Sequence, residues 1–251
     1  MSSALRISPL FLGMIAVTVF GGVLTTMTNQ VALTAGVVLV VLGGWAVSLC
    51  LHEFGHAITA YRGGDWTVRE KGYLTLDPRR YTDPVLSIVL PLIFVAIGGI
   101  PLPGGAVWIN HAALRTRRTE SMVSLAGPST NLIAGMLLAG AIALIPMPIG
   151  LAAALSYLAF LQVIAFVLNI LPIPGLDGYG VIEPWLSHPA RRFGEKARPW
   201  APLALFVVLI GIPVVGRLFF SFAYFVFDVL GGDPTLTSFG NSLFRSIFGG
   251  L

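Results

Sequence analysis

The sequence predicts an all-α polytopic membrane protein with about six transmembrane or re-entrant helical segments. Of the 251 residues, 56% are hydrophobic and only 10% are charged, and the mean hydropathy is +0.87. An average soluble domain has about 25% charged residues, and a soluble fold of this length cannot bury so many apolar side chains. Several uncharged stretches are long enough for membrane-spanning helices of about 20 residues. The composition therefore excludes a soluble enzyme.

The predicted spans follow the uncharged stretches in chain order. Residues 7–52 contain no Asp, Glu, Lys or Arg, which leaves room for two spans. Residues 121–176 are uncharged as well, and a proline-containing turn at 146–148 divides them into two more. Glycine and proline interrupt a last apolar region, so we expect one kinked helix or two short ones there. The predicted spans lie at about 9–28, 32–61, 121–145, 150–171 and 201–230.

Two further segments lie between the second and third of these spans. Within the polar residues 62–83, partial alternation of apolar and polar side chains predicts a short β-hairpin over residues 66–76. Residues 84–105 then pass from a short apolar run into a stretch rich in glycine and proline. This pattern predicts a re-entrant or membrane-associated loop. Together the segments indicate one integral membrane domain, 1–251, with a C-terminal helical region at about 199–230.

The basic residues predict the orientation of the chain in the membrane. Loops rich in Lys and Arg stay on the cytoplasmic side, and the two connections assigned to the other side carry no charge. We therefore interpret the positive charge as a signal of orientation and expect no nucleic-acid partner. The expected location is the inner or plasma membrane of a prokaryotic cell. Nearly all of the 15 Lys and Arg residues lie in four segments, at residue 6, 62–83, 115–118 and 191–198.

The stretch His52-Glu53-Phe54-Gly55-His56 is the candidate metal site. Two histidines at positions i and i+4 lie on one face of a helix, so both imidazoles can bind one metal ion. Glu53 lies beside them. Ionisable residues within a transmembrane segment need partners and are functional by default. The alternative interpretation is that these three side chains are satisfied polar residues within a helix bundle.

A catalytic zinc site usually has three protein ligands, so a third ligand must come from elsewhere in the chain. Asp177 follows the span at 150–171, and the predicted topology places it on the same side of the membrane as His52 and His56. An Asp-Gly pair after a helix also fits an ordinary turn, and the pattern alone does not separate the two interpretations. The rival candidates, which we interpret as solvated, surface or loop residues, are Asp65, Asp77, Asp83, Glu183, His111 and His188.

Three blocks stand out along the chain: HEFGH at 52–56, AGPSTN at 126–131 and NILPIPGLDG at 169–178. In this order and at these places in the predicted spans, the blocks resemble the site-2 proteases, a family of intramembrane zinc metalloproteases. The third block is the most specific of the three. The resemblance covers about residues 30–185, which would form the metal-binding core. It is closest to the compact form of the family, which has no PDZ domain.

The resemblance implies a chemical role for each of the candidate residues. His52, His56 and Asp177 would bind one Zn²⁺ per chain, and Glu53 would be the general base. Asn169 would contact the scissile peptide or its oxyanion. The substrate would be a transmembrane protein or peptide within the lipid bilayer, cleaved within or near its membrane-spanning segment. The active site would face the cytoplasmic side.

Two alternatives belong to other functional classes. A metal-handling transporter or channel would need acidic residues or histidines repeated along several spans, whereas here the spans outside one cluster are almost bare of them. A catalytically inert relative would bind membrane segments as a chaperone or scaffold. The presence of His52, Glu53, His56 and Asp177 together argues against the inert relative, because such a protein need not keep all four.

Overall fold

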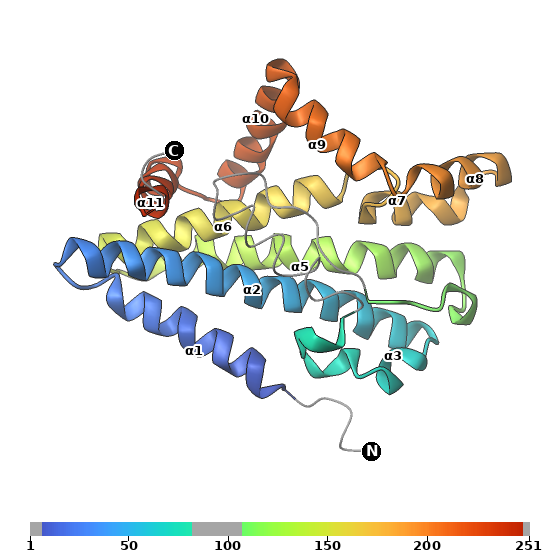
Figure 1. Ribbon diagram of the computed structural model, residues 1–251, viewed down its shortest axis with the longest axis horizontal. Helices are drawn as coiled ribbons and strands as arrows, with labels where there is room; N and C mark the ends of the chain where they lie inside the picture. The colour runs from blue at the N-terminus through green and yellow to red at the C-terminus, as the bar shows by residue number, and fades with distance from the viewer. Residues whose placement is uncertain (1–6, 82–106, 248–251) are drawn as a thin grey trace.

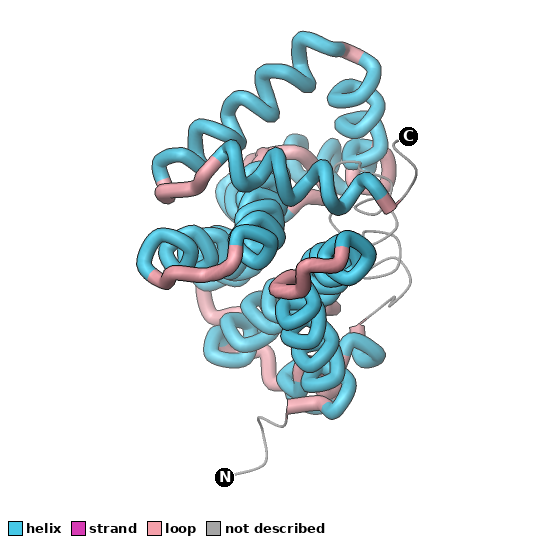
Figure 2. The backbone as a smooth tube through the Cα atoms, turned by 90° about the vertical axis from the view of Figure 1, so that its left-hand side faces the viewer, coloured by secondary structure: helices cyan, strands magenta, loops and turns pink. Residues whose placement is uncertain are grey.

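Three long helices lie side by side at the centre of the protein. The computed structural model describes residues 7–81 and 107–247. Helix α2 (Gln30–Gly63) contacts both α5 (Arg117–Leu144) and α6 (Ile149–Asn169), and α5 also contacts α6. The three helices run along the long axis of the molecule (Figure 1), and the end-on view in Figure 2 shows them bundled together. In the residues described, every regular element is helical.

Local sequence signals set the ends of the long helices. The side chain of Asn29 accepts hydrogen bonds from the backbone N–H groups of residues 31 and 32, which caps the start of α2. Helix α2 ends at Gly63, and the residue that follows it, Gly64, has a φ of 120°, in the region that favours glycine. Thr116 caps α5 in the same way through the backbone N–H of Thr119. These boundaries agree with the predicted second, third and fourth spans to within a few residues.

Residues 7–81 and 107–247 contain fewer candidate spans than the six transmembrane or re-entrant segments expected of the whole chain. Among the described residues, only α2, α5 and α6 are long and apolar enough to cross a membrane individually. Helix α1 (Pro9–Leu24) has 16 residues and is about 24 Å long, short of the roughly 30 Å hydrocarbon core. Helices α9 (Ala201–Gly211) and α10 (Pro213–Val229) would together make a fourth span, but they meet at an angle of 99°. The structure thus confirms a helical membrane protein, with three or four candidate spans in the part of the chain that it describes.

The predicted β-hairpin over residues 66–76 is wrong. This part of the chain forms the short helix α3 (Thr67–Glu70) and the 3₁₀ turn η1 (Tyr73–Thr75). Gly72 and Leu76, at the two ends of η1, have φ angles of 78° and 54°, and these left-handed residues coil the chain tightly. The buried apolar side chains of this segment therefore pack beneath the end of α2 instead of alternating across a sheet. The predicted re-entrant segment 84–105, like Asp83, lies outside the described residues.

Short helices complete the described part of the chain. The amphipathic helix α11 was not predicted, because it follows the last apolar region of the sequence. It lies against α6, where the hydroxyls of Ser156 and Thr237 are 2.8 Å apart. The short elements are η2 (Pro78–Arg80), η4 (His111–Ala113), α7 (Asp177–Ile182), η5 (Glu183–Trp185), α8 (His188–Ala197) and α11 (Pro234–Ser246).

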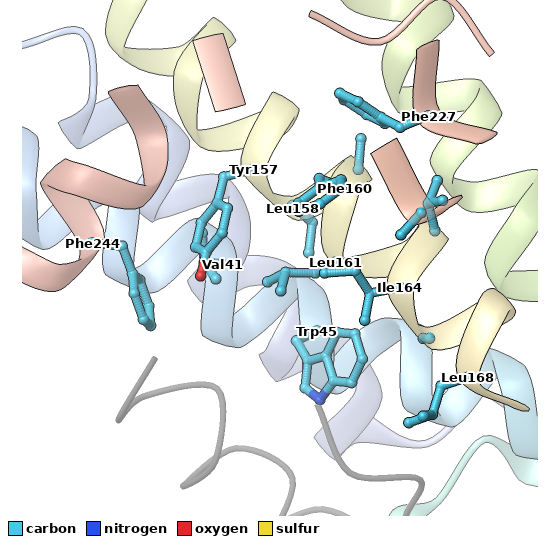
Figure 3. Close-up of a cluster of buried hydrophobic side chains, with 14 of the residues drawn as sticks. Val41, Trp45, Tyr157, Leu158, Phe160, Leu161, Ile164, Leu168, Phe227 and Phe244 are labelled. Carbon is cyan, nitrogen blue, oxygen red and sulfur yellow. The ribbon is translucent and has the colours of Figure 1, made fainter. Parts of the chain in front are cut away.

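Helix α6 is buried along nearly its whole length and forms the middle of the main apolar cluster. Figure 3 shows Leu161 and Ile164 of α6 beside Trp45 of α2, with Phe227 and Phe244 covering other parts of the cluster. The helices around α6 include α2, α5, α10 and α11. Polar side chains on α6 therefore face protein, and they need partners there.

The close contact between α1 and α2 gives a first prediction. A β-carbon on Gly21 would lie 2.6 Å from the β-carbon of Leu39 and 2.9 Å from the carbonyl oxygen of Gly36. Replacing Gly21 with valine should therefore push α1 away from α2 and lower the free energy of unfolding by about 1–3 kcal/mol. Thermal unfolding in detergent measures this effect. Gly13→Val is the matched control, because a β-carbon on Gly13 in the same helix meets no atom within 4 Å. Equal stability of the two variants would contradict the predicted contact.

Candidate metal centre

Two histidines of α2 and the first residue of α7 meet in a buried cluster. The Nε2 atoms of His52 and His56 are 3.1 Å apart. Asp177 places its Oδ2 atom 3.2 Å from Nε2 of His52 and its Oδ1 atom 3.4 Å from Nε2 of His56. Both histidines are buried, whereas about a quarter of the Asp177 side chain is exposed. The structure therefore brings Asp177 against two histidines that lie more than 120 residues earlier in the sequence.

Local structure explains how the three side chains meet. One helical turn separates His52 from His56, so their rings project from the same face of α2 and meet edge to face, with centroids 4.8 Å apart. Helix α6 ends at Asn169, and two tight turns follow before α7 begins. Gly175, with a φ of 95°, lies in these turns. The turns reverse the chain and bring Asp177 back against the two rings.

The other nitrogen of each imidazole ring faces a carbonyl oxygen. Nδ1 of His52 lies 2.5 Å from the side-chain oxygen of Asn131, and Nδ1 of His56 lies 2.7 Å from the backbone oxygen of Val123. A carbonyl oxygen can only accept a hydrogen bond, so each neutral ring carries its proton on Nδ1. Each Nε2 then has a free lone pair. Two lone pairs and one carboxylate converge on the same space, and such a set of donors could hold a metal ion.

The donor set and its spacing fit a zinc ion. Catalytic zinc sites combine histidine nitrogens with a carboxylate oxygen at about 2.0–2.2 Å from the metal, and leave the fourth position open. Two such ligands of a tetrahedral ion lie about 3.3–3.4 Å apart. The two Nε2 atoms are 3.1 Å apart, and each of them lies 3.2 or 3.4 Å from a different oxygen of the Asp177 carboxylate. Gly127 of α5 faces the cluster. A β-carbon there would contact Nε2 of His56 and lie 2.6 Å from Nε2 of His52, so glycine keeps this space open.

Glu53 lies beside the cluster and is buried, with 3% of its surface exposed. Its Oε2 atom accepts a hydrogen bond of 3.0 Å from the backbone N–H of Val107. The carboxylate is thus held at the edge of the cluster, where it can exchange a proton with a molecule bound there.

Sequence reasoning did not single out Asn131 as an individual residue. This residue belongs to the block at 126–131, and its side chain contacts the ring of His52. The block at 126–131 was therefore the sequence signal that could have pointed to Asn131. The structure places Asn169 at the C-terminal end of α6, where it is buried. Its predicted contact with a substrate stays a prediction.

Two of the rival carboxylates have structural partners. Asp65 is fully buried, and it accepts hydrogen bonds from Thr67 and from the backbone N–H of Asn110. Asp77 is also buried and forms two side-chain hydrogen bonds with Arg79. Hydrogen bonding to Arg79 holds the pKa of the Asp77 carboxyl below its usual value. Our interpretation of these two residues as solvated charges was wrong, although neither belongs to the cluster.

The remaining rivals lie in surface interactions away from the cluster. Glu183 forms a salt bridge of 2.8 Å with Arg198. His111 lies 2.9 Å from Glu120, and His188 is exposed at the start of α8. None of the three shares the space between α2 and α7. These positions agree with their interpretation as surface and loop residues.

Comparison with known proteins identifies relatives named as zinc metalloproteases. The chain is 47% identical over 247 residues to Rip2 of Mycobacterium tuberculosis, a match that covers 96% of this chain and 95% of the relative. Rip2 of Mycolicibacterium smegmatis is 46% identical over the same length. YwhC of Bacillus subtilis is 33% identical over 178 residues, which cover 67% of this chain and 78% of that protein. No family model and no solved structure matches the chain.

The space kept open by Gly127 gives the second prediction. Gly127→Ala should place a methyl group against both Nε2 atoms and weaken zinc binding about tenfold or more, in the range found when a metal site is disturbed at its outer contacts. Zinc per chain, measured by atomic emission on purified protein, reports the change. Gly140→Ala is the matched control, since it lies in the same helix and has no neighbouring atom within 4 Å. A full complement of zinc in Gly127→Ala would show that the metal lies elsewhere.

Proposed function

Because the chain belongs to the site-2 protease family of intramembrane zinc metalloproteases, we propose that it hydrolyses peptide bonds within or near transmembrane segments of membrane proteins. The observation that carries this proposal is the convergence of two imidazole lone pairs and one carboxylate beside the buried Glu53. The names of the relatives favour a protease over a metal-handling transporter or an inert relative.

In this proposal, His52, His56 and Asp177 hold one zinc ion per chain. Their three ligand atoms lie within 4.8 Å of one another and supply the two nitrogens and one oxygen that such a site uses. When bound, zinc lowers the pKa of a water molecule towards neutrality and polarises the carbonyl group to be attacked. The Nδ1 contacts of the two histidines hold both rings in the orientation that this role needs.

Glu53 is the proposed general base. Its carboxylate accepts a proton from the attacking water and later delivers a proton to the nitrogen of the leaving amine. The backbone N–H of Val107 fixes one oxygen of this carboxylate, which limits its motion during both transfers. Asn169 is the proposed hydrogen-bond donor to the oxyanion of the scissile peptide.

The membrane setting supports a substrate that is itself a membrane protein. The proposed metal ligands lie in the C-terminal third of α2 and beyond the end of α6, which are two of the candidate spans. A transmembrane helix uses its peptide groups in internal hydrogen bonds, so a helical substrate must unwind locally before it is cut. We propose a multi-pass protein of the bacterial membrane, with one protease domain over 1–251 and the active site towards the cytoplasm.

The role of Glu53 gives the third prediction. Glu53→Gln keeps the size of the side chain but removes its ability to accept a proton, so the rate of cleavage should fall by about 10²- to 10⁴-fold. Zinc content should stay at the level of the parent protein. Cleavage of a single-span substrate in detergent or proteoliposomes measures the rate. Full activity of Glu53→Gln would overturn the assignment of Glu53 as the base.

The role of Asp177 gives the fourth prediction. Asp177→Ala removes one of three ligands and should reduce zinc per chain to well below one, because two imidazoles alone bind the ion more weakly. Glu183→Gln is the matched control: this carboxylate lies six residues further on and pairs with Arg198, away from the cluster. An unchanged zinc stoichiometry in Asp177→Ala would point to a different third ligand.

A further inference from the structure

A chain of buried hydrogen bonds runs from His52 across all three long helices. Nδ1 of His52 contacts Oδ1 of Asn131 in α5, and Nδ2 of Asn131 donates to Oε1 of Gln162 in α6 at 2.8 Å. Nε2 of Gln162 donates to Oγ of Ser48 in α2 at 2.9 Å, and Ser48 donates to the backbone oxygen of Trp45 at 2.8 Å. We call Ser48, Gln162 and Asn131 the amide relay. All three are buried, and Gln162 is only 1% exposed.

The backbone oxygen at the end of the relay sets its direction. This oxygen of Trp45 can only accept, so the single proton of the Ser48 hydroxyl points towards it. Ser48 then offers a lone pair to Gln162, whose NH₂ group must face it. The carbonyl oxygen of Gln162 therefore faces the NH₂ group of Asn131. As a result, the carbonyl oxygen of Asn131 faces His52 and takes the proton on Nδ1.

If the hydrogen bonds of the relay ran in the opposite direction, one bond would be lost and His52 could not bind a metal ion. If both amides were rotated by 180°, the Ser48 hydroxyl would have to donate to Gln162 and would lose its bond to the Trp45 carbonyl. The NH₂ group of Asn131 would then face Nδ1 of His52. The neutral ring would carry its proton on Nε2, which could no longer bind a metal. The state in which His52 can bind a metal ion thus has one more buried hydrogen bond than the state in which it cannot.

The two histidines differ in what fixes the proton to Nδ1 of the ring. Nδ1 of His56 contacts the backbone oxygen of Val123 at 2.7 Å, and a backbone carbonyl within a helix cannot turn round. Nδ1 of His52 contacts a side-chain amide, which can present either its oxygen or its nitrogen. Only His52 therefore depends on further groups, which fix whether the oxygen or the nitrogen of the Asn131 amide faces the ring.

We propose that Gln162 and Ser48 are positioning residues of the metal centre, which hold the oxygen of Asn131 towards His52 and keep Nε2 of His52 available to zinc. This inference rests on the proposed function of the cluster. A glutamine buried in the middle of an apolar helix is costly unless it is hydrogen-bonded, and both ends of the Gln162 amide are used here. Neither residue touches the substrate or the reacting atoms in this proposal.

The test measures zinc affinity in purified, detergent-solubilised full chain. Gln162→Met keeps the length of the side chain but releases the Asn131 amide, so we expect zinc to bind about 10- to 100-fold more weakly in competition with a chelator. The visible spectrum of the cobalt-substituted protein should change as well, because one ligand is partly lost. Ser156→Ala is the matched control, since this buried hydroxyl of the same helix contacts Thr237 instead of the relay. It should leave both readouts unchanged.

A second pair of variants keeps the test decisive if Gln162→Met fails to fold. Ser48→Ala removes the group that sets the direction of the relay and should weaken zinc binding in the same sense. Ser48→Thr retains the hydroxyl and should bind zinc as tightly as the parent protein. Parental zinc affinity and cobalt spectrum in folded Gln162→Met, or in Ser48→Ala where Gln162→Met does not fold, would overturn the relay while leaving the metal site intact. If the parent protein itself binds no zinc, the proposed function fails, and the relay fails with it.

Discussion

The structure depends on one constraint, which is that polar groups inside an apolar helix bundle must find partners within the protein. This constraint is strongest at the cluster of His52, His56 and Asp177, because two ring nitrogens and a carboxylate lie close together there. Each histidine ring is satisfied at Nδ1 by a carbonyl oxygen. The remaining donor atoms of the cluster face one another, in an arrangement that could hold a metal ion.

One face of α5 supplies the partners of both histidine rings and the space in front of them. Val123, Gly127 and Asn131 are spaced four residues apart, so they lie along one side of the helix. The first supplies a backbone oxygen to His56, the second leaves room in front of both rings, and the third supplies an amide oxygen to His52. Helix α5 therefore shapes the site without contributing a metal ligand. Its packing against α2 and α6 therefore fixes the geometry of the cluster as well as the fold.

Sequence reasoning found the features that depend on local spacing. The i, i+4 pair of His52 and His56 could be read directly, because helical geometry fixes which side chains share a face. Asp177 could not be separated from an ordinary turn residue by spacing alone, and the family resemblance decided between the two interpretations. The hairpin expected over residues 66–76 failed because partial alternation also arises in short turns whose apolar residues pack beneath a helix. The glutamine at 162 gave no local signal, since its partners are 31 and 114 residues away.

The unequal burial of the three cluster residues bears on how water reaches an apolar bundle. Both histidine side chains are 9% exposed, whereas the side chain of Asp177 is 25% exposed. The histidines lie within the long helix α2, but Asp177 begins a short helix beyond the end of α6. Among the three side chains, the most exposed one is therefore on the side of α7. Hydrolysis consumes one water molecule for each bond cut, and a site that opens at one end of the bundle admits water without exposing the apolar interior of α2 and α6.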